Sequence, residues 1–100
     1  MSEVKVYKMI SGEEVIGNQI TETDTHYTVD KPASIMMTDQ GNGKVGVGIA
    51  PFMPYAEGEK VDINRLAVAA SATPASEMLN EYNRIFGSGL IVPPKGILKG

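Results

Sequence analysis

The side chains that could do chemistry in this 100-residue chain are few, and they gather around its single histidine. Glu22, Asp24 and His26 alternate along the sequence, so in an extended strand all three would point to the same side. Carboxylates and an imidazole together can bind a divalent metal ion. The chain has no cysteine and no second histidine to complete such a site, so a polar strand face turned to solvent is the favoured interpretation. We expect no metal site and no cofactor.

The same scarcity argues against catalysis. A lone histidine limits nucleophilic and acid–base mechanisms, and no stretch of the sequence visibly buries a pair of carboxylates. Gly41-Asn42-Gly43-Lys44 is superficially like a phosphate-binding loop, but it lacks the longer glycine spacing and the hydroxyl after the lysine. A tight hairpin turn accounts for it instead. We therefore expect no catalytic residues and no enzymatic activity.

Length and composition are those of one ordinary folded domain. The chain is 42% hydrophobic and 21% charged, and a chain of this size buries about 60–70% of the surface that its unfolded form exposes. Met1–Lys5 lacks the basic-then-apolar pattern of a signal peptide, and no apolar run approaches the roughly 18–20 residues of a membrane span. We expect a cytoplasmic (intracellular) protein with no membrane partner.

Most of the chain is predicted to form strands, which must position these side chains. Adjacent Val15 and Ile16 indicate that both faces of the second strand are partly covered. Lys31-Pro32 interrupts the third strand, because proline cannot donate to a ladder. The expected strands are Val4–Ile10, Glu14–Thr21, His26–Asp30 continuing as Ser34–Thr38, Lys44–Ala50 and Val61–Ala72.

One helix is predicted after the strands. Thr73 and Pro74 form a strong helix start, apolar residues then recur at helical spacing, and Gly87 ends the run. A rod of this length, about 20 Å, can cover one end of a barrel. The expected organisation is a β-barrel over residues 1–72, a helix packed on it over 73–87 and a tail over 88–100, in a single domain.

A glycine pattern near the N-terminus carries a family resemblance. Gly12 supplies the positive φ of a tight hairpin turn, and Gly17 inside the next strand marks a bulge, a bend or a close approach. The order of Gly12, two variable residues, Val-Ile and Gly17 resembles the opening of the first Sm motif of Sm, Sm-like and Hfq proteins. Asp24-Thr25-His26-Tyr27-Thr28 is similar to the rest of that motif. Ile63-Asn64-Arg65, with Val68 beyond, is similar to the second motif.

The resemblance implies a mainly β fold: a small, strongly bent five-stranded antiparallel Sm-like (SH3-like) barrel with a C-terminal α-helix. It also implies two loops at a central pore that bind single-stranded RNA, where bases stack on planar side chains and hydrogen-bond to polar ones. Half-burial in a strand is the alternative for Tyr27, and a rim salt bridge is the alternative for Arg65. The candidate RNA-binding residues are Asp24, His26, Tyr27, Thr28, Asn64 and Arg65.

Assembly is the second implication. The fourth strand and the last strand are long, apolar and rich in small residues, so their exposed edges would pair with another chain. Head-to-tail pairing of one subunit's fourth strand with the next subunit's fifth closes a homo-oligomeric ring of about five to seven subunits. The candidate interface residues are Val45, Gly46, Val47, Gly48, Ile49, Phe52, Met53, Tyr55, Leu66 and Val68.

Three alternatives to an RNA-binding ring stay open. The net charge of −3 lacks the basic footprint of nucleic-acid binders, and the Arg-Gly pair of the second Sm motif is missing, so a structural or adaptor ring that binds only proteins is one. A second is a small monomeric barrel that binds peptides in an apolar aromatic groove. In the third, the C-terminal helix covers the strand edges, and the chain is a monomer.

Overall fold

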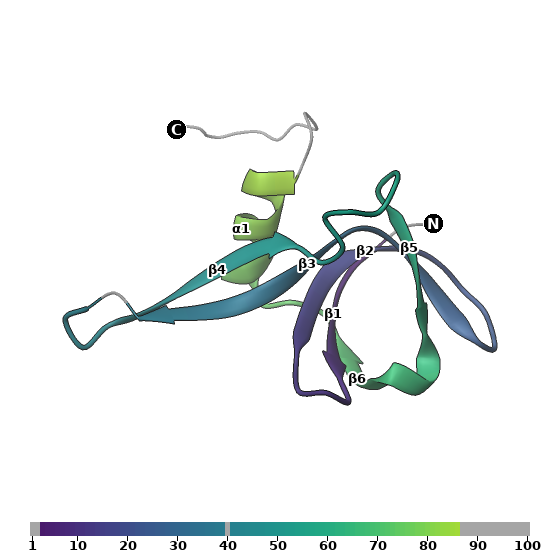
Figure 1. The fold of residues 1–100 in the computed structure, drawn as a ribbon, viewed down its shortest axis with the longest axis horizontal. Helices are drawn as coiled ribbons and strands as arrows, with labels where there is room; N and C mark the ends of the chain where they lie inside the picture. Colours follow the sequence, from purple (N-terminus) through teal and green to yellow (C-terminus); the bar gives the residue numbers. More distant parts are fainter. Residues whose placement is uncertain (1–2, 40, 87–100) are drawn as a thin grey trace.

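One strongly bent antiparallel sheet of six strands forms most of the molecule (Figure 1). The computed structural model describes residues 3–39 and 41–86. Along the main path of the sheet the order is β4-β3-β2-β1-β6, and β5 pairs separately with β3. The elements are β1 (Glu3–Met9), β2 (Glu14–Glu22), β3 (His26–Asp39), β4 (Val45–Pro51), β5 (Lys60–Asn64), the 3-10 helix η1 (Arg65–Ala67), β6 (Val68–Ala72) and α1 (Ser76–Phe86).

A tight hairpin joins β1 to β2, as the sequence predicts. Gly12 takes a φ of 97°, and its N–H donates to the carbonyl of Met9 over 2.9 Å. Only glycine adopts that φ without strain. The pairing then runs without a shift from Lys8 opposite Glu14 to Glu3 opposite Gln19.

The sheet bends at Gly17 of β2, beside the neighbouring strand β3. A Cβ on Gly17 would overlap the Cγ1 of Val29 and would lie 3.1 Å from the Cα of Pro32. The pairing of the two strands shifts register between Ile16 and Asn18, which is the signature of a bulge. The close approach predicted for Gly17 is therefore confirmed.

The bend separates two apolar clusters that lie on opposite faces of the sheet. Inside the curl, the buried cluster consists of Tyr7, Met9, Val15, Val29 and Ile63. On the outer face, α1 covers Ile16 and Ala33 with the buried ring of Tyr82. Successive side chains of a strand face opposite ways, so neighbours Val15 and Ile16 enter different clusters. Both are fully buried, which confirms the prediction that both faces of β2 are covered.

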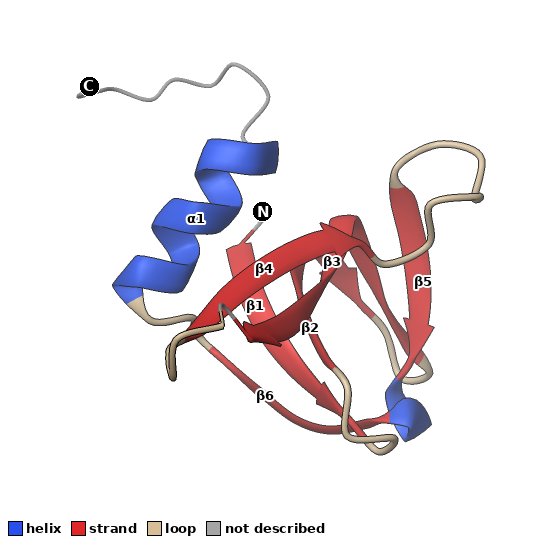
Figure 2. Cartoon of the chain, turned by 60° about the vertical axis from the view of Figure 1, so that its left-hand side comes forward, coloured by secondary structure: helices blue, strands red, loops and turns tan. Residues whose placement is uncertain are grey.

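The helix α1 packs on the sheet through side chains four residues apart. Met78, Tyr82 and Phe86 form its inner stripe, and the Tyr82 and Phe86 rings stack with their centroids 5.3 Å apart. The Tyr82 hydroxyl donates to the carbonyl of Lys31 over 2.8 Å. Lys31 has a φ of 52°, which is rare for a residue with a side chain, and its carbonyl turns toward the helix. Figure 2 shows α1 alongside the curled sheet.

The mainly β fold with one C-terminal helix is confirmed, and its details differ from the sequence-based expectation. The sheet has six strands and does not close into a barrel. The expected last strand, Val61–Ala72, is divided by η1 into β5 and β6, because Asn64 caps the 3-10 turn. The helix begins at Ser76 and not at Thr73, and its expected end at Gly87, like the tail over 88–100, falls outside the described residues.

The expected break in the third strand is also corrected. β3 runs through Lys31-Pro32 as a kink, because its two halves have different partners. The first half pairs with β5 from His26 to Asp30, and the second half pairs with β4 from Ala33 to Asp39. The β3–β4 hairpin consequently projects away from the rest of the sheet (Figure 1).

Candidate functional site

Five of the six candidate RNA-binding residues meet at one corner of the molecule, where the β2–β3 turn faces the end of β5. His26 pairs with Asn64, Tyr27 with Ile63 and Thr28 with Asp62. Arg65 follows directly in η1, and its N–H donates to the carbonyl of Thr25 over 2.9 Å. The two segments that resemble Sm motifs are therefore neighbours in space. The sixth candidate, Asp24, is exposed in the turn.

Thr23 holds the β2–β3 turn in one shape. Its Oγ1 accepts from the N–H of Thr25 over 3.2 Å and from the N–H of His26 over 3.1 Å. Its own N–H donates to the carbonyl of His26 over 2.8 Å. A side chain that replaces missing backbone partners in this way is the usual role of threonine in turns. The turn lies between β2 and β3, so Glu22, Asp24 and His26 do not share the face of one extended strand.

His26 lies between a threonine and a carboxylate. Its Nδ1 is 3.0 Å from the Oγ1 of Thr25, and its Nε2 is 3.8 Å from Asp62 Oδ1. The same Asp62 oxygen accepts from the hydroxyl of Thr28 over 2.8 Å. Asp62 was not among the residues expected here, although it lies two positions before Asn64 and so on the same face of an extended strand.

Arg65 is the most connected side chain of the corner. Its Nη1 donates to Glu22 Oε2 and to the carbonyl of Thr23, each over 2.8 Å. Its guanidinium carbon lies 5.1 Å from the centre of the Tyr27 ring, within the range of a cation–π contact. The rim salt bridge considered for Arg65 is therefore present. Glu22 is a partner that the RNA-binding candidates did not include.

Tyr27 and Asn64 serve the fold at this corner. Tyr27 is half-buried, and its ring contacts both the guanidinium of Arg65 and the tilted ring of Tyr7, whose centroid is 5.4 Å away. Asn64 Oδ1 accepts from the N–H of Leu66 over 2.8 Å and so caps η1. The planar groups at the surface of the corner are therefore the guanidinium of Arg65 and the imidazole of His26.

The charge of the corner is predominantly negative. Glu22, Asp24 and Asp62 carry carboxylates, against the guanidinium of Arg65 and the imidazole of His26. Within the part of the chain that the structure describes, no three acidic or histidine side chains are grouped so as to hold a metal ion. The corner offers hydrogen-bond acceptors, one cation and flat polar surfaces, which suits recognition of a planar ligand better than proton transfer.

Half of the candidate interface residues are exposed to solvent: Val45, Val47, Met53, Tyr55 and Leu66. The other half are half-buried: Gly46, Gly48 and Ile49 on β4, and Phe52 and Val68, which pack against the inner cluster. Ile49 packs toward α1. Val45, Val47 and Ile49 alternate along β4 and lie opposite Asp39, Met37 and Ile35, so one apolar stripe continues from beneath the helix to the end of the hairpin.

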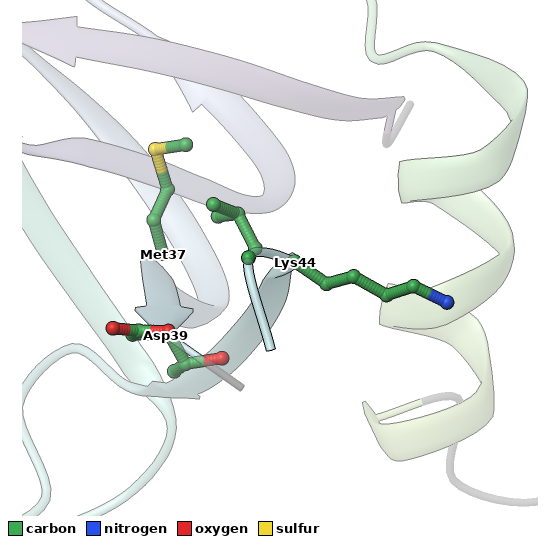
Figure 3. Close-up of a pocket in the computed structure, with 6 residues that line it drawn as sticks. Met37, Asp39 and Lys44 are labelled. Atoms are coloured by element: carbon green, nitrogen blue, oxygen red, sulfur yellow. The ribbon is translucent and has the colours of Figure 1, made fainter. Parts of the chain in front are cut away.

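Two shallow hollows lie away from the corner formed by the β2–β3 turn and the end of β5, which is called the polar corner here. One, of about 460 Å³, is at the end of the hairpin and is lined by Met37, Thr38, Asp39, Gly43, Lys44 and Val45. Figure 3 shows the side chains of Met37 and Lys44 pointing in different directions, so they do not converge on a common ligand. The other, of about 240 Å³, lies between Pro32, Pro54 and Phe86.

Comparison of the chain with protein-family models and with curated proteins finds no match to either. Across residues 3–39 and 41–86, no helix is long and apolar enough to cross a membrane.

Proposed function

We propose that this chain is the subunit of a homo-oligomeric ring of the Sm-like type that binds single-stranded RNA. The observation that carries the proposal is the position of two strands. β4 and β6 lie at the two ends of the main sheet path, and each pairs with one other strand among those described, β4 with β3 and β6 with β1. The described part of one copy thus has an unpaired edge on β4 and another on β6, besides that of β5, which pairs only with β3.

Neither edge strand contains a charged residue, although β4 ends at Pro51 and the β1–β6 pairing shifts register between Lys8 and Met9. β4 reads Val-Gly-Val-Gly-Ile-Ala-Pro and β6 reads Val-Ala-Ala-Ser-Ala, with no charged residue in either. Soluble proteins commonly protect free edges with charges, bulges or a covering element. The helix α1 packs instead on the outer face of the sheet, over Ile16 and Ala33. A Cβ on Gly48 would meet nothing within 4 Å, so that face of β4 is open as well.

Pairing two different edges is a head-to-tail contact, and repeated rotation of the same contact closes a ring. We propose about five to seven subunits, the range that the Sm-like resemblance implies. The exposed residues of β4 and of the loop after it, together with Leu66 beside β6, would form the seam between subunits.

The polar corner is the part of the subunit that we assign to RNA. An unpaired base would stack on the guanidinium of Arg65 or the imidazole of His26, and its edge would hydrogen-bond to Asp24, Asp62 or Thr28. Arg65 supports this role because the Glu22 and Thr23 oxygens fix its guanidinium over the ring of Tyr27. A fixed planar cation loses little entropy on stacking.

The test is fluorescence anisotropy with short U-rich and A-rich oligonucleotides at low ionic strength. We expect salt-sensitive binding, and a loss of about tenfold or more in affinity for Arg65→Ala, since one base stack contributes about 1–3 kcal/mol. Arg84→Ala is the matched control, because Arg84 is an exposed arginine on α1 paired with Glu81. Arg65→Ala binding as tightly as Arg84→Ala would refute the assignment of the corner.

A structural or adaptor ring is the second candidate, and the Arg65–Glu22 ion pair favours it. The single arginine of the corner is already neutralised at 2.8 Å, and two more carboxylates lie nearby, which would repel a phosphate backbone. A protein of ring mass that binds neither oligonucleotide at low salt would support this candidate and exclude the first.

A further inference from the structure

The end of the β3–β4 hairpin carries the sequence Gly41-Asn42-Gly43, which neither the proposed ring nor the polar corner uses. All three residues are exposed, and the two glycines take positive φ values of 88° and 79°. The pairing of β3 with β4 extends only as far as Asp39 opposite Val45. Asn42 and the backbone nitrogen that follows it therefore lie in a solvent-exposed turn outside the sheet.

An asparagine in such a turn can react with its own backbone. The nitrogen of the next residue must approach the Cγ of the asparagine side chain, which strand and helix geometry prevent. Glycine favours this approach because it has no Cβ to crowd its nitrogen and can adopt many backbone conformations. A Cβ on Gly43 would meet nothing within 4 Å, so the space around this residue is open. Asn42 thus has an unhindered nucleophile directly after it.

The two asparagines of the sheet are placed differently. Asn18 lies within β2, which pairs with β1 on one side and with β3 on the other. Asn64 ends β5, and its Oδ1 accepts from the N–H of Leu66 over 2.8 Å. The nitrogen that follows it, that of Arg65, donates its hydrogen to the carbonyl of Thr25 over 2.9 Å. Both the side chain and the next nitrogen of Asn64 are therefore already in use.

The other two asparagines, Asn80 and Asn83, lie inside α1. Each is followed by a residue with a side chain, Glu81 and Arg84 respectively. In a helix the N–H of such a residue donates to the carbonyl four positions back, which holds the nitrogen away from the asparagine side chain. Of the five asparagines of the chain, all of which the structure describes, Asn42 alone lies outside a strand or helix and precedes a glycine.

We propose that Asn42 is a site of spontaneous deamidation in the folded protein. The Gly43 nitrogen loses its proton and attacks Cγ of Asn42, the new N–Cγ bond closes a succinimide ring, and the Cγ–Nδ2 bond breaks to release ammonia. Water then opens the ring. Attack of water at Cγ gives aspartate, and attack at the backbone carbonyl of Asn42 gives isoaspartate, in which the main chain runs through the former side chain. Water is the co-reactant, and nothing is oxidised or reduced.

The products change the charge of the hairpin end. Asp39 and Lys44 are exposed there and carry opposite charges. The new carboxylate gives this end a net negative charge and lowers the formal charge of the chain by one from −3. Because Asn42 lies beyond the last paired residues, Asp39 and Val45, the β3–β4 pairing stays in place. The protein therefore acquires acidic forms with age while it remains folded.

The test is to incubate the natural protein in mildly alkaline buffer and to follow each asparagine by peptide mapping with mass spectrometry. We expect Asn42 to convert at least about tenfold faster than the other four, because they must first leave their strand or helix. No conversion at Asn42, or conversion of another asparagine at the same rate, would overturn the proposal.

A parallel incubation in guanidinium chloride shows whether the folded turn protects Asn42. We expect the rates at Asn42 in the folded and the unfolded chain to agree within about threefold, since an exposed turn needs no opening. The other asparagines should react faster once unfolded. A rate at Asn42 that is about tenfold or more lower in the folded protein would show that the turn is protective, and the proposed site would be refuted.

Two variants and the product mixture test the chemistry. Asn42→Gln lengthens the side chain and disfavours ring closure, so the acidic species on ion-exchange chromatography should disappear. Asn83→Gln is the matched control and should leave that species unchanged. We expect both isoaspartate and aspartate at position 42, and a rate that rises with pH because the Gly43 nitrogen must lose its proton. Aspartate as the sole product would indicate direct hydrolysis of the side chain and would overturn the succinimide route.

Discussion

Gly17, Lys31 and Tyr82 together form the bend of the sheet. Gly17 lets β2 approach β3 so closely that any Cβ would overlap Val29. Lys31 accepts a φ of 52°, which turns its carbonyl toward the helix, and the Tyr82 hydroxyl donates to that carbonyl. The strain of a left-handed lysine, on the order of 1–3 kcal/mol, persists because the helix and both strands hold it in place. The bend of the sheet and the packing of α1 on it therefore depend on the same residues.

Gly17→Ala is expected to destabilise the fold by about 2–3 kcal/mol, because the new methyl group must displace both Val29 and the backbone of Pro32. The measurement is the midpoint of urea unfolding, with the slope held constant. The control is the double variant Gly17→Ala/Val29→Ala. In the Val29→Ala background, Gly17→Ala should lower the free energy of unfolding by less than it does in the natural protein, since Val29 supplies the closest atom. Equal costs in the two backgrounds would show that the overlap does not decide the bend.

Tyr82 gives the fold a pH dependence at the alkaline end. Burial raises the pKa of the Tyr82 hydroxyl well above its ordinary value, and the charge of Asp30 adds to the shift. The folded state thus holds the proton more tightly than the unfolded state, so this contribution is complete below about pH 10 and is lost as the pH rises further. We expect the free energy of unfolding of the natural protein to fall as the pH rises above about 10, with a slope that approaches about 1.4 kcal/mol per pH unit for each such tyrosine.

Tyr82→Phe is the comparison. At neutral pH it should cost about 1–3 kcal/mol, because the carbonyl of Lys31 loses its donor. Its stability should then fall less steeply above pH 10 than that of the natural protein. Tyr7 keeps part of the slope in both proteins, since burial also raises the pKa of its hydroxyl. Parallel pH profiles for the two proteins would contradict the assigned shift.

At the scale of the elements, the sequence predicted those features that depend only on residues close together in the chain. The Gly12 turn, the two-sided burial of β2 and the inner stripe of α1 could all be predicted from spacing alone. The path of β3 could not, because its continuity depends on changing partners from β5 to β4 across Lys31. The polar corner was predicted in its two segments, but Glu22 and Asp62 were missed, since ion pairs between strands far apart in sequence leave no local pattern.

A prediction at this scale concerns the edge of β4 that pairs with no other described strand. Val47→Lys, at an exposed position of β4 opposite Met37, places a charge in the apolar stripe beside that edge. We expect it to abolish assembly and to change the stability of the separated subunit by less than about 0.5 kcal/mol. Asn83→Lys, on the exposed side of α1, adds the same charge elsewhere and should leave assembly intact. Size-exclusion chromatography of both variants is the measurement, and co-elution of the two would contradict the role of the edge.

At the scale of the whole molecule, β4 and β6 present unlike edges that pair with no other described strand, and α1 packs on a face of the sheet. The edges lie at opposite ends of the order β4-β3-β2-β1-β6. If the edge of β4 in one copy pairs with the edge of β6 in the next, the contact repeats by rotation, as the proposed ring requires. The polar corner recurs once in each subunit, so a ligand that bound one copy weakly would bind several at once in the ring.

The central claim is assembly, and the most direct test is the mass of the natural protein in solution by multi-angle light scattering. One chain has a mass of 10.7 kDa. We predict a single species of about five to seven times that mass, stable on dilution. A species of 10.7 kDa at every concentration would contradict the ring and the pairing of strand edges between copies.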